Sequence, residues 1–205
     1  GGMLIGKVKE IGKELQGKID LNVGDKIATL VSLSLTPLKI NKIKRVVLDQ
    51  DQVEIDGEAI LFESGIYAKL PDDMTETFAL SVLDVAGAPA QAERLAKKGQ
   101  TVFIIGAGGK SGLLFTAMAR EVMGNEGKII GLVHSAGSRA TAEKLGMCDD
   151  IIQGSATDAL FIYNQIYALT NGEMADLVIN CVNVPDTEMA SILASKDRGT
   201  VYFFS

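Results

Sequence analysis

The chain has few of the residues that bind metals or form disulfides. Among its 205 residues there are two cysteines, Cys148 and Cys181, and one histidine, His134. Two distant cysteines indicate a reducing compartment and no disulfide framework, so we expect a cytoplasmic protein. The same three residues do not form a metal-ligand set, and the sequence therefore predicts no metal site.

Dense positive charge and long hydrophobic runs are also absent. The chain carries 26 acidic and 20 basic residues, a net charge of -6, and no dense basic run. Nucleic acids and anionic membrane surfaces are therefore not expected partners. The longest apolar stretches fall far short of a membrane span, and the start GGMLIGKVKE lacks the pattern of a signal peptide.

Ordinary chain ends are missing as well. The sequence begins without methionine, almost at once inside a strand pattern, and stops directly after the run VYFF. We therefore expect an internal piece of a longer polypeptide, whose C-terminal domain is incomplete.

What the chain does contain is a change of pattern near residue 75. Before it, apolar runs such as VGDKIATLVSLSLTP, IKRVVLD, DQVEIDG and EAILFE alternate with turn residues, which is typical of a small β-barrel or sandwich. Thr75 to Lys98 reads as helical, and Pro89 is expected to kink or divide this region. We predict a β-rich domain over residues 1–75 and a second domain over residues 76–205.

From Gly99 onward, apolar strands alternate with helices. The expected strands cover residues 101–105, 128–134, 149–153, 176–182 and 199–204, and the expected helices cover 111–123, 140–146, 158–170 and 186–194. Such alternation predicts an α/β fold with a parallel sheet covered on both faces. The fold class we predict is a Rossmann-type, doubly wound parallel sheet joined to a β-rich domain.

The most specific motif is the segment TVFIIGAGGKSG, Thr101 to Gly112. An apolar strand breaks into glycines, and a helix-compatible stretch follows. Side chains at these glycines would obstruct the turn or the approach of a pyrophosphate, and the amides at the helix start would face the anion. A purely structural turn is the alternative. A P-loop does not fit, because the glycine that it needs earlier in the motif is replaced by Ile104 inside the strand.

The end of the second strand bears on the choice of cofactor. Dinucleotide folds usually carry Asp or Glu there to bind the ribose, but this chain has Val133, His134 and Ser135, with Arg139 nearby. Serine and arginine could meet a 2′-phosphate, which favours NADP, although Arg139 could equally be an ordinary helix-start charge. His134 lies near the adenine side or has no role.

Other candidates follow the fourth strand or carry a carboxylate. Cys181 reads better as a small packed residue than as a nucleophile, and the loop after it should lie beside the cofactor. Asp84 is either a helix-surface charge or a cleft residue and is the one candidate catalytic residue. Asp186 is expected to cap the fourth helix. The predicted cofactor-binding residues are Gly106, Gly108, Gly109, Lys110, Ser111, Gly112, Ser135, Arg139, Cys181, Val182 and Asn183.

These strings resemble the medium-chain dehydrogenase/reductase superfamily over essentially the whole chain. Gly6-Lys-Val8, Gly12 and Val23-Gly24-Asp25-Lys-Ile27 are similar to its GroES-like barrel, and the nucleotide turn with RATAEKLGMCDDII is similar to its Rossmann domain. The resemblance implies that residues 1–75 are part of a GroES-like domain. It also implies a homo-oligomer. The zinc-dependent branch carries a cysteine in the helix before the first nucleotide strand, and Leu83–Gly87 has none.

GGMLIGKVKEIG, GAGGKSG and GTVYFFS resemble an amine-oxidising branch of the superfamily. The resemblance implies oxidative deamination of a small-molecule amino-acid substrate, with NAD as the usual cofactor and NADP as the alternative. A zinc-free quinone or enone reductase and a non-catalytic NAD(P)-binding module remain open as other functions.

Overall fold

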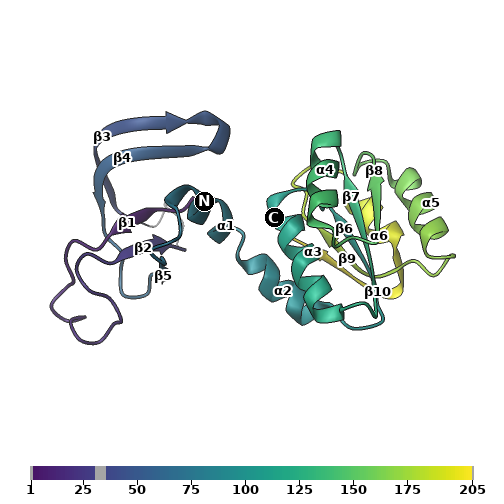
Figure 1. The fold of residues 1–205 in the computed structure, drawn as a ribbon, viewed down its shortest axis with the longest axis horizontal. Coiled ribbons are helices and arrows are strands. Elements are labelled where there is room, and N and C mark those ends of the chain that lie inside the picture. The colour runs from purple at the N-terminus through teal and green to yellow at the C-terminus, as the bar shows by residue number, and fades with distance from the viewer. Residues whose placement is uncertain (1, 31–35, 205) are drawn as a thin grey trace. The chain divides into compact units, whose positions relative to one another are not determined.

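The computed structural model describes residues 2–30 and 36–204, which form two compact units, Gly1–Asp84 and Val85–Ser205 (Figure 1). The expected run VGDKIATLVSLSLTP lies partly outside the described residues, at positions 31–35. The division falls after Asp84, whereas the sequence places the boundary after residue 75. Helix α1 (Glu76–Leu83) groups with the first unit, and Lys26 Nζ lies 3.0 Å from Glu76 Oε1.

The first unit contains two small antiparallel sheets. A three-stranded sheet has the order β1-β2-β5, and a separate hairpin pairs β3 with β4 through the 3-10 turn η2. The bounds are β1 (Ile5–Lys7), β2 (Lys26–Thr29), β3 (Leu38–Val47), η2 (Leu48–Gln50), β4 (Gln52–Ala59) and β5 (Tyr67–Lys69). The run EAILFE is strand only as far as Ala59, which is shorter than its apolar pattern predicts. The strands also divide between two separate sheets.

The second unit is built on a five-stranded parallel sheet with the order β10-β9-β6-β7-β8. Its strands are β6 (Thr101–Ile105), β7 (Lys128–Val133), β8 (Asp150–Gln153), β9 (Ala175–Asn180) and β10 (Ser195–Phe203). Renumbered from the first nucleotide strand, the order reads 3-2-1-4-5, which is that of the doubly wound dinucleotide-binding fold. The fold class predicted from the sequence is confirmed.

Helices cover both faces of this sheet (Figure 1). Alternate residues of β6 divide between two cores: Val102 and Ile104 pack with α2, α3 and α4, and Phe103 and Ile105 pack with α5 and α6. The helices are α2 (Gly87–Leu95), α3 (Lys110–Met123), α4 (Ala136–Leu145), α5 (Ala159–Leu169) and α6 (Glu188–Ala194). The strands are therefore buried on both sides, which explains their uninterrupted apolar runs.

One helical region divides close to where the sequence predicts, and the start of one helix differs from the expectation. The region 75–98 divides between α1 and α2, just before Pro89. Pro89 lies in the first turn of α2, where a backbone N–H has no partner within the helix, so its missing N–H costs no hydrogen bond. Helix α4 begins at Ala136 rather than near residue 140, because Ser135 and Ser138 form a capping box. The usual capping box has Glu or Gln at the position that Ser138 occupies here.

Candidate functional site

The candidate site lies where the strand order of the sheet reverses. Strands β6 and β9 are hydrogen-bonded neighbours, yet the connections from them run to opposite sides of the sheet. In open α/β sheets, ligands bind outside the carboxyl ends of the strands at this switch point. The segments that leave those ends are the glycine turn, residues 106–112, and the loop 181–187 after β9. The structure thus brings together two of the three segments that the sequence assigned to the cofactor; the third, with Ser135 and Arg139, follows β7.

Backbone hydrogen bonds fix the glycine turn. Gly106 has φ +86°, a conformation that favours glycine, and its N–H donates to the Leu132 carbonyl at 3.0 Å. The Gly109 N–H donates to the Gly106 carbonyl at 3.0 Å. Helix α3 begins at Lys110 with Gly109 as its N-cap, a residue that has no side chain to cap it. The first N–H groups of α3 therefore receive no side-chain bond from their N-cap, and an anion at this helix start would satisfy them.

The glycines of the turn are required for two different reasons. A Cβ at Gly112 would lie 2.1 Å from the Gly106 oxygen, and a Cβ at Gly108 would lie 2.3 Å from the Ser138 oxygen. Close packing of α3 and α4 against the turn therefore accounts for these two glycines. A Cβ at Gly109 would meet only the Gly106 oxygen, at 3.4 Å, and otherwise point into open space. That open space at a helix N-terminus is a cradle that fits a pyrophosphate.

Lys110 and Ser111 occupy the first two positions of α3. Lys110 is exposed and Ser111 is half-buried. Their place at the start of the helix puts both residues beside the cradle. The turn has no room for the longer phosphate-wrapping loop of a P-loop, since it contains only Gly106 to Gly109 between β6 and α3.

The residues predicted to read the ribose already have partners within the protein. The Ser135 hydroxyl accepts the Ser138 N–H at 3.2 Å as the N-cap of α4. The Arg139 Nε donates to Glu143 Oε1 at 2.7 Å, and its Nη1 donates to the Ile151 carbonyl at 3.4 Å. Both side chains follow β7 as expected, but Arg139 is directed along α4 and toward β8. His134 is exposed at the end of β7.

The loop after β9 meets the glycine turn directly. The Cys181 N–H donates to the Ile105 carbonyl at 3.0 Å, and a Cβ at Gly106 would lie 3.2 Å from a methyl group of Val182. Burial raises the pKa of the Cys181 thiol to about 12, so the thiol stays protonated and packs as a small apolar group. Asn183 is exposed.

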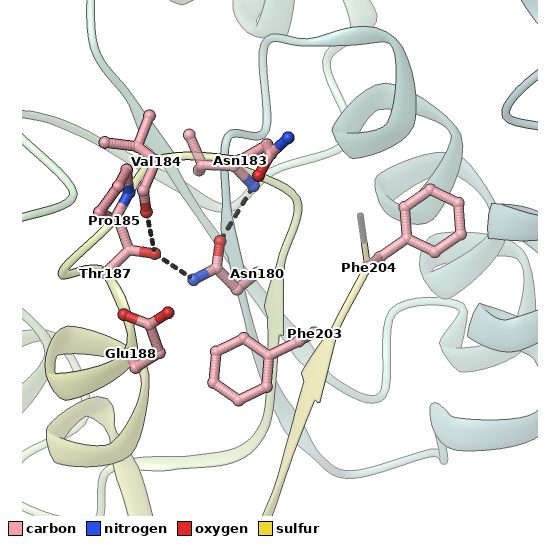
Figure 2. Close-up of a pocket in the computed structure, with 9 residues that line it drawn as sticks. Asn180, Asn183, Val184, Pro185, Thr187, Glu188, Phe203 and Phe204 are labelled. Atoms are coloured by element: carbon pink, nitrogen blue, oxygen red, sulfur yellow. Dashed lines mark hydrogen bonds between the residues drawn. The ribbon is translucent and has the colours of Figure 1, made fainter. Parts of the chain in front are cut away.

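A pocket of about 500 Å³ opens at the ends of β9 and β10 (Figure 2). It is lined by Asn180, Val182, Asn183, Val184, Pro185, Thr187, Glu188, Phe203 and Phe204. Phe204 packs edge-on against Phe115, with ring centroids 5.1 Å apart, and this contact anchors the far wall of the pocket to α3. Of the predicted residues, Val182 and Asn183 line this pocket, and Asn180 is a residue that the sequence reasoning missed.

Asn180 joins the end of β9 to the loop and to helix α6. Its side-chain amide donates to the Thr187 hydroxyl at 2.9 Å and to the Ser191 hydroxyl at 3.0 Å, and its oxygen accepts the Val182 N–H at 2.9 Å. Figure 2 shows the first and third of these bonds, with the bond from Thr187 to Val184. The available signal in the sequence was a polar residue closing an otherwise apolar strand.

The acidic candidates occupy different places. Asp84 is exposed and follows α1 as its C-cap. The prediction that Asp186 caps the fourth helix is wrong: Thr187 is the N-cap, and Asp186 has φ +67°, outside the conformation of an N-cap. Glu188 lies in the first turn of α6 and lines the pocket. Within residues 2–30 and 36–204, no group of three His, Cys, Asp or Glu side chains is placed to hold a metal.

The doubly wound order, with an uncapped glycine turn at its switch point, defines a dinucleotide-binding class of α/β domain. Two family models match the chain: the L-erythro-3,5-diaminohexanoate dehydrogenase N-terminal domain at residues 1–71, and a domain described as zinc-binding dehydrogenase at residues 111–205. Each of the two compact units is thus similar to a dehydrogenase domain family over most of its length. None of the described helices is long and apolar enough to cross a membrane.

Curated relatives match over the whole chain. The chain is 56% identical over 205 residues to L-erythro-3,5-diaminohexanoate dehydrogenase of Acetoanaerobium sticklandii, and 51% identical to the enzyme of that name from Fusobacterium nucleatum. All of this chain is covered in both comparisons, and it spans 60% and 59% of the lengths of these relatives.

Solved structures share the fold. A Pseudomonas syringae quinone oxidoreductase matches with a TM-score of 0.71 and 21% identity, over 100% of this chain and 55% of its own. A mycobacterial protein complexed with NADPH matches with a TM-score of 0.70 and 22% identity, over 100% of this chain and 56% of its own. At these identities the likeness shows the fold alone.

Proposed function

We propose that the protein carrying this chain catalyses the NAD(P)-dependent oxidative deamination of L-erythro-3,5-diaminohexanoate to 5-amino-3-oxohexanoate and ammonia. The observation that carries this proposal is the 56% identity, across the entire chain, to an enzyme of that name. The geometry supports the cofactor half of the proposal. The turn at the switch point offers helix N–H groups and open space beside Gly109, which an anionic pyrophosphate would fill.

Two parts of the chain would hold the cofactor. The turn, residues 106–112, would bind the pyrophosphate through the amides that begin α3, with Lys110 supplying positive charge. The loop 181–183 would lie beside it, since Val182 is in contact range of Gly106. Cys181 would contribute its packed thiol and its backbone rather than a nucleophile, because burial raises its pKa to about 12.

We propose NAD as the cofactor, with NADP as the alternative. A 2′-phosphate needs a cation that is free to pair with it. Arg139 is the basic residue that the sequence offers after β7, and its guanidinium is held by Glu143 and by the Ile151 carbonyl. The Ser135 and Ser138 hydroxyls are similarly engaged in the capping box of α4. NADP would have to displace these contacts, whereas NAD would leave them intact.

The reaction balances through an imine. A bound nicotinamide would supply the hydride acceptor for the amine-bearing carbon of the substrate. The substrate nitrogen would first lose its ammonium proton to a base. The C=N bond that forms is then hydrolysed by water to the ketone and ammonia. The task of the protein is to bind the amine deprotonated and to hold its carbon beside the acceptor, and such positioning supplies much of the rate.

For the base we propose Asp84 as the candidate to be tested first. It is an exposed carboxylate at the end of α1. Asp84→Asn removes the proton acceptor and keeps the shape. If Asp84 is the base, kcat falls by roughly 10²–10⁴ while cofactor affinity is unchanged. Unchanged kcat in the Asn variant rules it out as the base.

The proposed function is tested by following NAD(P)H absorbance with a panel of substrates. We expect turnover with L-erythro-3,5-diaminohexanoate and NAD, with one ammonia released for each NADH formed. We expect no turnover with alcohols. Oxidation of NAD(P)H by conjugated ketones without amine turnover would establish a zinc-free enone or quinone reductase instead. Cofactor binding without any turnover would establish a non-catalytic NAD(P)-binding module.

We further propose that the protein is a cytoplasmic homo-oligomer with a small-molecule substrate and no nucleic-acid or membrane partner. The two cysteines are free, which is compatible with a reducing compartment. Sedimentation equilibrium tests the oligomeric state, and a molecular mass equal to that of one chain contradicts it.

A further inference from the structure

One buried polar cluster in the second unit has no part in the cofactor contacts described above. Asn180 is 3% exposed, Thr187 is 2% exposed and Ser191 is fully buried, at the base of the loop that follows β9. Buried polar side chains are costly unless their hydrogen bonds are made, so a cluster in this position is held for a purpose that apolar packing would not serve.

The donors and acceptors of the cluster admit only an amide at position 180. The Thr187 hydroxyl gives its proton to the Val184 carbonyl at 3.1 Å, and the Ser191 hydroxyl gives its proton to the Thr187 carbonyl at 2.9 Å. Each hydroxyl therefore has only acceptor capacity left. The NH₂ group of Asn180 has two hydrogens, and it donates one to each of these two hydroxyl oxygens.

The oxygen of the Asn180 amide holds the residue whose side chain lies next to the glycine turn. Asn180 Oδ1 accepts the Val182 N–H at 2.9 Å, and Val182 is the residue that approaches Gly106. A flipped amide would put its oxygen against two hydroxyls that have no proton left and its NH₂ against an N–H donor. Asn180 thus bonds Val182 and Thr187 directly, and the Thr187 hydroxyl in turn bonds Val184. These three residues line the pocket.

We propose that Asn180 is a positioning residue, whose amide holds the loop 181–187 in the shape that receives the nicotinamide side of the cofactor. This inference rests on the proposed dinucleotide binding. Asn180 does so without contacting the ligand through its amide nitrogen, whose two hydrogens are bonded within the protein. Aspartate, which has the same shape, cannot replace it because a carboxylate supplies no donor.

The surroundings of Asn180 would make the carboxyl that Asn180→Asp introduces responsive to pH. The strand partners of Asn180 are Ile105 on β6 and Phe203 on β10, and the side chains facing it from the loop and α6 are the Thr187 and Ser191 hydroxyls. Among the described residues that line the pocket, Glu188 alone is ionisable; Asp186 precedes Thr187 on the loop, and the adjacent Cys181 thiol is uncharged. With burial and no cation in that lining, the pKa of the introduced carboxyl would lie above its ordinary value. Once protonated, the carboxyl regains one donor.

The test measures affinity and stoichiometry for NAD by calorimetry in wild type and in Asn180→Asp. We expect Asn180→Asp to weaken binding at least about tenfold near pH 8, and to recover part of the loss relative to wild type near pH 6. A purely structural role would lower the active fraction or Tm at both pH values and leave the affinity of the folded molecules unchanged. That result, or an affinity within about twofold of wild type near pH 8, overturns the inference.

A matched pair at Thr187 keeps the inference testable should Asn180→Asp fail to fold. Thr187→Val has the same shape but no hydroxyl, and Thr187→Ser retains the hydroxyl. We expect Thr187→Val to weaken NAD binding about threefold to tenfold and Thr187→Ser to stay within about twofold of wild type. Equal affinities for both variants contradict the role of the cluster. Absence of binding of both NAD and NADP in wild type defeats the proposed function itself, so the two failures are distinguishable.

Discussion

The two segments that meet at the switch point are held in place by different means. The glycine turn, residues 106–112, is fixed by its own backbone and by the absence of side chains, as the 2.1 Å approach of a Gly112 Cβ to the Gly106 oxygen illustrates. The loop 181–187 is fixed by side chains, through the amide of Asn180 and the hydroxyl of Thr187. The glycine turn and the loop therefore both present a fixed surface at the switch point of the sheet.

The two segments are therefore expected to tolerate different substitutions. The backbone-held turn has no slack at Gly112 or Gly108, but it has open space at Gly109, where the ligand is expected. The loop held by side chains tolerates changes of size at exposed Asn183 but not a change of hydrogen-bonding type at buried Asn180.

The largest effect is expected at Gly112. In Gly112→Val the new Cβ would overlap the Gly106 carbonyl and lie 2.7 Å from the Ala107 Cα, both of which are backbone atoms. We expect a loss of about 3 kcal/mol or more in the free energy of unfolding, measured by chemical denaturation. A variant as stable as wild type would show that α3 can move away from the turn and that the packing argument is wrong.

A smaller effect concerns the reactivity of Cys181. Only the thiolate is alkylated, and a pKa of about 12 leaves roughly a thousandfold less thiolate near pH 8 than an unperturbed cysteine has. In a Cys148→Ser background, iodoacetamide should label Cys181 slowly near pH 8, and the rate should rise about tenfold per pH unit up to the pKa. Rapid labelling near neutral pH would contradict the packed role of this thiol.

The smallest effect is expected at Arg139. Its guanidinium is occupied by Glu143 and the Ile151 carbonyl, so Arg139→Ala should change the affinity for NAD by less than about threefold. Parallel titrations with NAD and NADP provide the measurement. A selective loss of NADP binding would show that Arg139 leaves Glu143 to read the 2′-phosphate, and NADP would then become the favoured cofactor.

The second unit could be predicted from the sequence because its signals are local and consistent. The runs at 101–105 and 128–133 are apolar throughout most of their length, as strands buried on both faces must be, and Gly106 follows the first of them directly. The first unit was predicted less well. Its buried described residues are Ala28, Thr29, Thr36 and Ala79, so little core patterning marks its strands.

The parts of the site that escaped prediction depend on contacts between distant residues. Asn180 bonds partners seven and eleven positions later, and only the fold of the loop brings them together. Gly131 is a similar case, since a Cβ there would lie 2.8 Å from the Ala107 Cβ. The expected cap at Asp186 failed because the loop enters α6 with that residue in the left-handed region. Neither propensity nor spacing encodes such geometry.

If the glycine turn holds the pyrophosphate of a dinucleotide, Gly109→Val should block binding without unfolding the protein. Gly109 has φ -87° and ψ 170°, which valine adopts readily, and its Cβ would have only one neighbour, at 3.4 Å. We therefore predict a folded variant, with a denaturation midpoint close to that of wild type, whose affinity for NAD in calorimetric titration falls by about a hundredfold or more. Unchanged affinity in the folded variant would show that the glycine turn is not part of the binding site.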